Sequence, residues 1–171
     1  KKGVEIYKQW VSTKIFTASF TASDGTASAQ PILNRPLVVQ AENQQGYVVI
    51  IGTGRYFVNG DRADTDIQSM YGIWDRLGND LVPKSKLVQQ AYTNQCETVT
   101  GDDSVATTTC GRALSDESVN LLVSDDESVT PSVLGWYNDL NAAAAGDIAG
   151  SSGERAIRNF QIRGGIGFVN S

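Results

Sequence analysis

The 171-residue sequence contains no histidine, two cysteines and one methionine. Without an imidazole, the chain alone cannot form a Ser-His-Asp triad, a Cys-His pair or a zinc site with a histidine ligand. Two cysteines are also too few for a four-thiolate zinc site. The chemistry that remains is that of carboxylates or oxygen-ligated metals, or no chemistry at all.

Basic residues and long apolar runs are also scarce. The sequence has 14 Lys and Arg against 19 Asp and Glu, a net charge of −5, which argues against nucleic-acid binding because phosphates require a basic face. The longest apolar run, residues 47–51, has the length of a buried strand and falls far short of the roughly 20 residues that span a membrane. The sequence begins without an initiator methionine or a signal peptide, as either a mature secreted protein or an excised fragment of a larger one would, and we favour the fragment.

The two cysteines, Cys96 and Cys110, enclose thirteen mostly small, polar residues with Gly101 and an Asp pair at the centre. This pattern predicts a hairpin that brings the two sulfur atoms together. A disulfide there would remove roughly 3 kcal/mol of unfolded-chain entropy by closing a loop of about 15 residues. The alternative is two free thiols in a reducing cytosol. The disulfide is favoured, and it indicates the periplasm or the cell exterior.

Short runs of β-branched and aromatic residues, separated by Gly, Asn and Asp turns, predict an all-β chain. The strands are expected at residues 15–21, 36–41, 47–52, 69–76, 87–93, 119–123, 134–140, 155–162 and 164–169. Helical structure is expected only as a turn at 64–69 and in the alanine-rich stretch 140–146. This spacing is typical of a sandwich, a barrel or part of a propeller.

Several segments carry a recognisable pattern. The sequence Gly-Thr-Gly-Arg-Tyr-Phe at 52–57 precedes a polar loop and then Gln-Ser-Met-Tyr-Gly-Ile-Trp-Asp at 68–75. Upstream lies Gln-Pro-Ile at 30–32; downstream lie Leu-Val-Gln-Gln at 87–90, Gly-Trp-Tyr at 135–137 and Gly-Glu-Arg at 153–155. In order and spacing these segments resemble the C-terminal β-propeller of the PilY1/PilC type IV pilus biogenesis proteins. The residues that carry the family motif are Gly52, Thr53, Gly54, Tyr56, Tyr71, Gly72, Trp74, Asp75, Gly135, Trp136, Glu154 and Arg155.

The resemblance implies antiparallel sheets that form part of a β-propeller, an incomplete ring, with short helical insertions at most. Residues 1–171 would belong to a single propeller domain, interrupted by a disulfide-closed hairpin insertion at 94–112 and a loop insertion at 141–152. A blade needs about 40 to 50 residues, so this chain should not close a ring. The remainder of its own propeller is therefore one expected partner.

The resemblance also implies a non-enzymatic role at the pilus tip: supporting pilus assembly, adhesion and twitching motility. The implied partners are minor pilins, with a host-cell surface as a further contact. The implied location is the cell surface and fimbrium, reached through the periplasm and outer membrane. No cofactor is expected within this chain, and the family's acidic calcium loop is absent from it, which leaves calcium for other parts of the full-length protein.

Three other chemical interpretations stay open. Asp61, Asp64 and Asp66 form the best oxygen cluster for a calcium ion, although the loop lacks EF-hand spacing and contains a competing arginine. Asp139 and Glu154 are candidates for a carboxylate glycosidase, but ion pairing with Arg155 and the nearby Arg158 explains them more simply. A secreted carbohydrate-binding β-sandwich would use a platform of aromatic rings, which a buried core explains more simply. The platform candidates are Trp10, Trp74, Trp136, Tyr47, Tyr56, Tyr71 and Tyr137.

Overall fold

The computed structural model describes residues 12–22, 24–41, 45–78, 80–100, 106–121, 132–140, 153–163 and 166–168. Its strands are β1 (Ser19–Thr21), β2 (Ala27–Ala29), β3 (Leu37–Gln40), β4 (Tyr47–Gly52), β5 (Ser69–Asp75), β6 (Val88–Gln89), β7 (Tyr92–Thr100), β8 (Ala106–Leu114), β9 (Gly135–Asp139), β10 (Gln161–Arg163) and β11 (Ile166–Phe168). Helical structure in these ranges consists of two short 3-10 helices, η2 (Asn59–Arg62) and η3 (Lys84–Lys86). Neither is long or apolar enough to cross a membrane.

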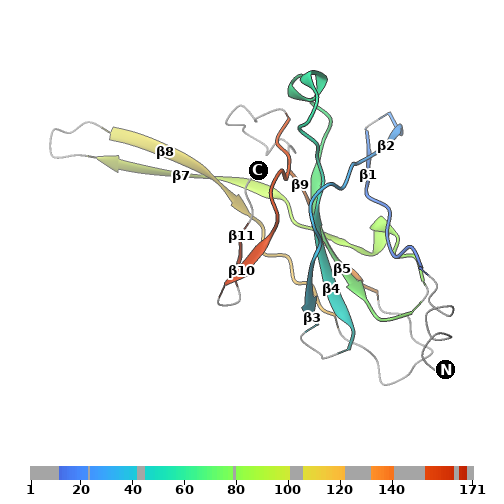
Figure 1. Cartoon of the computed structure of the whole chain (residues 1–171). Helices are drawn as coiled ribbons and strands as arrows, with labels where there is room; N and C mark the ends of the chain where they lie inside the picture. Colours follow the sequence, from blue (N-terminus) through green and yellow to red (C-terminus); the bar gives the residue numbers. More distant parts are fainter. Residues whose placement is uncertain are drawn as a thin grey trace, which may run out of the picture.

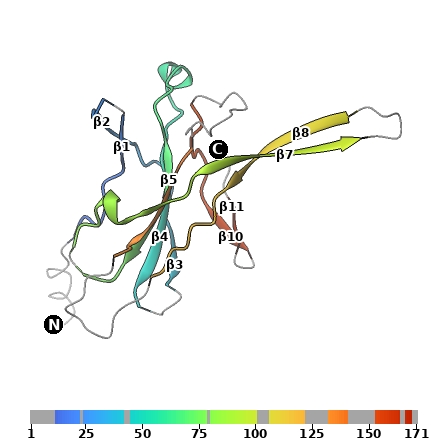
Figure 2. The same cartoon turned by 180° about the vertical axis from the view of Figure 1, so that it is seen from behind.

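A five-stranded sheet in the order β3-β4-β5-β9-β6 forms the centre of the fold (Figures 1 and 2). Its strands pair antiparallel except for β6 and β9, which are parallel over two residue pairs. A parallel neighbour needs a long connection, and the chain supplies one because the β7–β8 hairpin lies between β6 and β9. The all-β architecture is therefore confirmed, and the sheet is antiparallel with this one exception.

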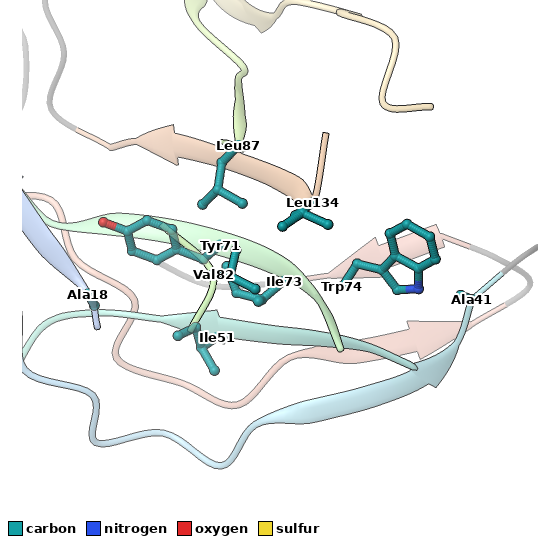
Figure 3. Packing of buried hydrophobic residues seen from close by; sticks show 9 residues of the cluster. All are labelled: Ala18, Ala41, Ile51, Tyr71, Ile73, Trp74, Val82, Leu87 and Leu134. Carbon is teal, nitrogen blue, oxygen red and sulfur yellow. The ribbon is translucent and has the colours of Figure 1, made fainter. Parts of the chain in front are cut away.

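The hydrophobic core lies on this sheet around β5. Side chains alternate along a strand, so Tyr71 and Ile73 share one face; both are fully buried and belong to the same cluster as Ile51, which is paired with Tyr71 on the neighbouring β4. Loop residues cover that face, among them Val82 and Leu87 (Figure 3). The core thus depends on loop residues as much as on strands.

Three two-stranded antiparallel hairpins extend the fold: β1–β2, β7–β8 and β10–β11. The β7–β8 hairpin is the longest and projects away from the central sheet (Figures 1 and 2). It confirms the hairpin expected around the cysteines, and its strands run from Tyr92 to Thr100 and from Ala106 to Leu114.

Some local predictions were wrong. The strand expected at 155–162 begins only at Gln161, because Arg155 and Ala156 are buried in contacts with a loop. The helical turn expected at 64–69 is absent, and the 3-10 turn occurs at 59–62 instead. Strand β2 was missed because Ala27–Ala29 carries small, exposed side chains without hydrophobic alternation. The expected loop insertion 141–152 and the Asp pair at the centre of the predicted hairpin lie outside the described residues.

Candidate functional site: a loop held by a buried arginine

Residues 53–68, here called the motif loop, connect β4 to β5 and contain most of the Gly-Thr-Gly segment. Thr53 closes the base of the loop: its amide donates to the Ser69 carbonyl at 2.9 Å, and its Oγ1 accepts from the Ser69 amide at 2.8 Å. The next residue, Gly54, has a φ of +129°, and a Cβ there would come within 2.5 Å of the Arg155 Cβ. A glycine is required here by both backbone conformation and space.

Asp61 organises the outer half of the motif loop. One carboxylate oxygen, Oδ2, accepts hydrogen bonds from the amides of Phe57 and Val58 at 2.8 and 3.0 Å. The other, Oδ1, pairs with Arg55 Nε at 2.7 Å. These two backbone hydrogen bonds, Val58 first, lower the pKa of Asp61, and Arg55 lowers it further while burial opposes the shift. Asp61 is therefore a carboxylate that fixes local backbone.

Arg155 lies beneath the loop and is only 6% exposed. Its Nη1 donates to the carbonyl oxygens of Arg55 and Asp61, at 2.9 and 2.7 Å, and its Nη2 donates to that of Asp64 at 2.5 Å. Nε donates to the carbonyl of Gly153 at 2.8 Å. A guanidinium offers five N–H donors in a rigid fork, and here it satisfies carbonyls that the irregular loop leaves without strand partners.

The three candidate calcium ligands occupy different hydrogen-bonding roles. The Asp61 carboxylate is engaged by one arginine and two amides, as described above. Asp64 Oδ1 accepts from the Asp66 amide at 2.9 Å, an Asx turn. Within the described part of the chain, no three His, Cys, Asp or Glu residues are grouped as metal ligands. Calcium binding by these residues stays a prediction.

The two glycosidase candidates contact cations other than the expected ones. Asp139 lies 3.5 Å from Lys84 Nζ and accepts from Ser69 Oγ at 2.5 Å. Glu154 pairs with Arg112 Nη2 at 2.7 Å. The expectation that Arg155 would pair with these carboxylates was wrong, because its guanidinium points into the motif loop.

A buried polar network surrounds Tyr71. Its hydroxyl donates to Gln30 Oε1 at 2.5 Å, and Gln30 Nε2 donates to Ser69 Oγ at 2.8 Å. Burial is the main cause that raises the pKa of Tyr71 to about 12. Lys84 completes the group, with its Nζ 4.4 Å from the centre of the Tyr137 ring. Sequence reasoning missed this network, because nothing in the sequence marks the glutamine of the Gln-Pro-Ile segment, Gln30, as buried.

The proposed aromatic platform is divided among different environments. Trp74 is 1% exposed and donates from Nε1 to the Gln45 carbonyl at 2.7 Å, and Tyr71 is fully buried. Tyr47 and Tyr56 are exposed, at 44% and 56%. The core interpretation therefore holds for Trp74 and Tyr71, whereas Trp10 lies outside the described residues.

The remaining motif residues support close packing of β5 against β9. A Cβ on Gly72 would come within 2.3 Å of Trp136 Nε1, so the indole lies directly over that glycine. Gly135 has a φ of +137°, and a Cβ there would meet the Gly72 carbonyl oxygen at 2.0 Å. At the end of β5, Asp75 Oδ1 accepts from the Leu77 amide at 2.8 Å and so closes the turn that follows.

The cysteines lie in directly opposed positions of the long hairpin, since the β7–β8 register pairs Cys96 with Cys110. Two neighbouring threonines, Thr98 and Thr108, are also paired and their hydroxyls lie 2.8 Å apart. At the base, Arg112 contacts the Tyr92 ring at 4.4 Å and joins the hairpin to Glu154.

Residues 8–108 match the family described as "PilY1 beta-propeller domain". The chain is 37% identical over 125 residues to type IV pilus biogenesis factor PilY1 of Pseudomonas aeruginosa PAO1, covering 70% of this chain and 10% of that protein. It is 27% identical over 152 residues to a PilY1 homolog of Xylella fastidiosa, covering 89% of this chain and 9% of that protein. The chain thus spans about a tenth of the length of these relatives.

A solved structure shows the same fold. The crystal structure of the Pseudomonas aeruginosa PilY1 C-terminal domain matches with a TM-score of 0.62 and 31% identity. The match covers 86% of this chain and 29% of the solved one.

Proposed function

This chain belongs to the PilY1 β-propeller domain family, and we propose that it acts as a non-enzymatic part of a pilus-tip protein that supports pilus assembly, adhesion and twitching motility. Its relatives are type IV pilus biogenesis factors. The chain corresponds to 29% of the solved C-terminal domain. We therefore assign it the role of a segment of a propeller whose remaining blades are its first partner.

The observation that supports this role most is the construction of the motif loop. The charged side chains of Arg155 and Asp61 form hydrogen bonds with backbone groups of the loop. The carboxylates of Asp139 and Glu154 each lie beside a cationic side chain. Charged groups that are satisfied in this way stabilise one conformation of the loop. A loop built in this way suits contact with another protein, and minor pilins or a host-cell surface are the partners that we propose.

The opposed cysteines support an oxidising location. An isolated two-stranded hairpin is only marginally stable in water, and a Cys96–Cys110 disulfide would compensate by constraining the unfolded chain. We propose that this disulfide closes a hairpin insertion at 94–112, and that the protein reaches the cell surface through the periplasm and outer membrane. We propose no cofactor for this chain and assign any calcium to other regions of the full-length protein.

Complementation of a strain that lacks the corresponding gene tests the role. The intact gene should restore surface pili and twitching, whereas a gene with codons 12–168 deleted in frame should not, even when the shortened protein is exported normally. A smaller deletion of residues 52–75 is less informative because it removes β5 from the middle of the central sheet. Full piliation with the in-frame deletion would refute the proposal.

A further inference from the structure

An open groove of about 340 Å³ lies beside the motif loop. Its lining residues belong neither to the polar network around Tyr71 nor to the cysteine hairpin. Three segments that are distant in sequence form its walls: residues 33–34, residues 54–57 and residues 157–158. Because the first and last walls lie more than a hundred residues apart in the chain, the groove exists only in the folded protein.

The groove displays large apolar side chains to solvent. Phe57 is 80% exposed, Tyr56 is 56% exposed, and Leu33 and Ile157 are 50% and 48% exposed. Val58 adds a further 62% exposed side chain directly after Phe57. Single exposed apolar residues are ordinary, but a contiguous group around a concave surface marks an interaction site.

Hydrogen bonds link the three walls, so the groove is already formed before a partner binds. The Gly54 amide donates to the Pro31 carbonyl at 2.9 Å, and the Ala156 amide donates to the Thr53 carbonyl at 3.0 Å. Asn34 Nδ2 donates to the carbonyl of Ala156 and so links the wall at 33–34 to the wall at 157–158. A partner would therefore not have to order these walls, which lowers the entropic cost of binding.

The lip that carries Phe57 is equally well fixed. The amides of Phe57 and Val58 both donate to the Asp61 carboxylate, and Arg155 holds the carbonyl of Arg55 from below. The backbone that presents Phe57 is therefore fixed before any partner binds, and a few residues, often aromatic, commonly supply most of the affinity of an interface.

The charge of the groove is opposite to that of the chain. Two arginines, Arg55 and Arg158, are among the described residues that line it, and no carboxylate is. Arg55 is neutralised by the buried Asp61, so Arg158 provides the net positive charge. The whole chain carries −5. A partner that complements this surface needs an apolar side chain with a carboxylate beside it.

We propose that this groove binds a short segment of another protein in which a bulky apolar side chain is flanked by acidic residues. The apolar side chain packs against Phe57, Tyr56 and Ile157, and a neighbouring carboxylate lies at Arg158. This inference rests on the proposed contact function and names the surface and the chemistry of its partner. A second copy of the groove would bring like charges together, which disfavours self-association through it.

Binding is tested by fluorescence anisotropy on the longest natural polypeptide that contains this chain. The probes are three short synthetic peptides with the same Leu-Phe centre, flanked by glutamates, serines or lysines. We expect the glutamate peptide to bind at least about tenfold more tightly than the lysine peptide, with an affinity that falls as salt is raised. No binding by any peptide, or equal binding by all three, would overturn the proposal.

Two substitutions locate the site. Phe57→Ser should abolish binding without unfolding the protein, because the side chain is 80% exposed. Arg158→Glu should lower the affinity for the glutamate peptide about tenfold and raise the affinity for the lysine peptide. Phe168→Ser and Arg163→Glu, at exposed positions of β11 and β10, are the matched controls and should change nothing. Binding that survives Phe57→Ser would contradict the assignment.

Two further outcomes separate this proposal from other occupants and from the pilus role. If the protein self-associates and Phe57→Ser makes it monomeric, a second copy fills the groove. If Phe57 is protected from hydroxyl-radical labelling in the polypeptide alone, another part of its own chain fills the groove. Either result would overturn the proposal. Failure of peptide binding together with loss of pili on in-frame deletion would remove the groove assignment and retain the biogenesis role.

Discussion

The Nη1 atom of Arg155 lies 2.7 Å from the backbone carbonyl oxygen of Asp61 and donates a hydrogen bond to it. These residues are 94 positions apart in the chain. The same guanidinium reaches the carbonyls of Arg55 and Asp64. The Gly-Glu-Arg and Gly-Thr-Gly segments are therefore two halves of one structural unit, and the loop between β4 and β5 takes its shape from a residue far downstream.

Replacing Arg155 by methionine should destabilise the protein by about 3 kcal/mol, because the loop carbonyls that it now binds would be left without hydrogen-bond donors. The unfolding free energy measured in urea checks this. Arg163→Met removes an exposed arginine and should change the free energy by less than about 0.5 kcal/mol. An unchanged urea midpoint for Arg155→Met would show that the loop does not depend on this side chain.

Gly72→Ala should cost about 1–3 kcal/mol, since the added methyl group would overlap the Trp136 indole and force β5 and β9 apart. Gly60→Ala is the matched control, because no atom lies within 4 Å of a Cβ at that position. Thermal unfolding followed by the near-ultraviolet signal of tryptophan measures both. Equal stability of the two variants would contradict the described packing.

Asp61 predicts a loss of stability in acid. Its pKa in the folded chain lies below the ordinary value of about 3.9. Between those two values the unfolded chain binds a proton that the folded chain does not, so the contribution is present above about pH 3.9 and is lost as the pH falls through the folded pKa. Urea midpoints from pH 6 to pH 2.5 should fall less steeply for Asp61→Asn than for the wild type.

The matched control for that titration is Asp80→Asn, which removes a carboxylate from an exposed position. It should reproduce the pH dependence of the wild type. If Asp61→Asn lost stability in acid as steeply as the wild type, the acid sensitivity would arise elsewhere.

The proposed Cys96–Cys110 disulfide predicts an intact mass about 2 Da below that of the reduced protein, since two hydrogen atoms are removed. Reduction, or Cys96→Ser, should make the β7–β8 hairpin cleavable by protease while the central sheet stays intact, because the hairpin projects away from it (Figure 1). Identical masses with and without reductant would exclude the disulfide.

The sequence predicted the central strands well because their signal is local. The run of valine and isoleucine in β4 and the short run of apolar and aromatic residues in β5 are strong β patterns by themselves. The hairpin around the cysteines was predictable for the same reason, from a turn with threonine-rich arms. The family motifs were read directly from the letters.

What the sequence did not reveal was set by long-range contacts. Nothing local marks Arg155 as a ligand of loop carbonyls, and the nearest acidic neighbour, Glu154, suggested an ion pair that forms with Arg112 instead. The polar network of Tyr71 and Gln30 joins residues 41 positions apart. The parallel β6–β9 pair also depends on how the chain returns after the hairpin, which no pattern within either strand specifies.

The central claim, that the folded sheet is needed for pilus biogenesis, is tested most directly by the amount of pilin sheared from cells. A strain lacking the gene is complemented with the wild type, Gly60→Ala or Gly72→Ala, at a temperature at which purified Gly72→Ala is largely unfolded. Wild type and Gly60→Ala should release equal amounts of pilin, and Gly72→Ala should release little. Wild-type amounts of sheared pilin from cells carrying the unfolded Gly72→Ala protein would contradict the account.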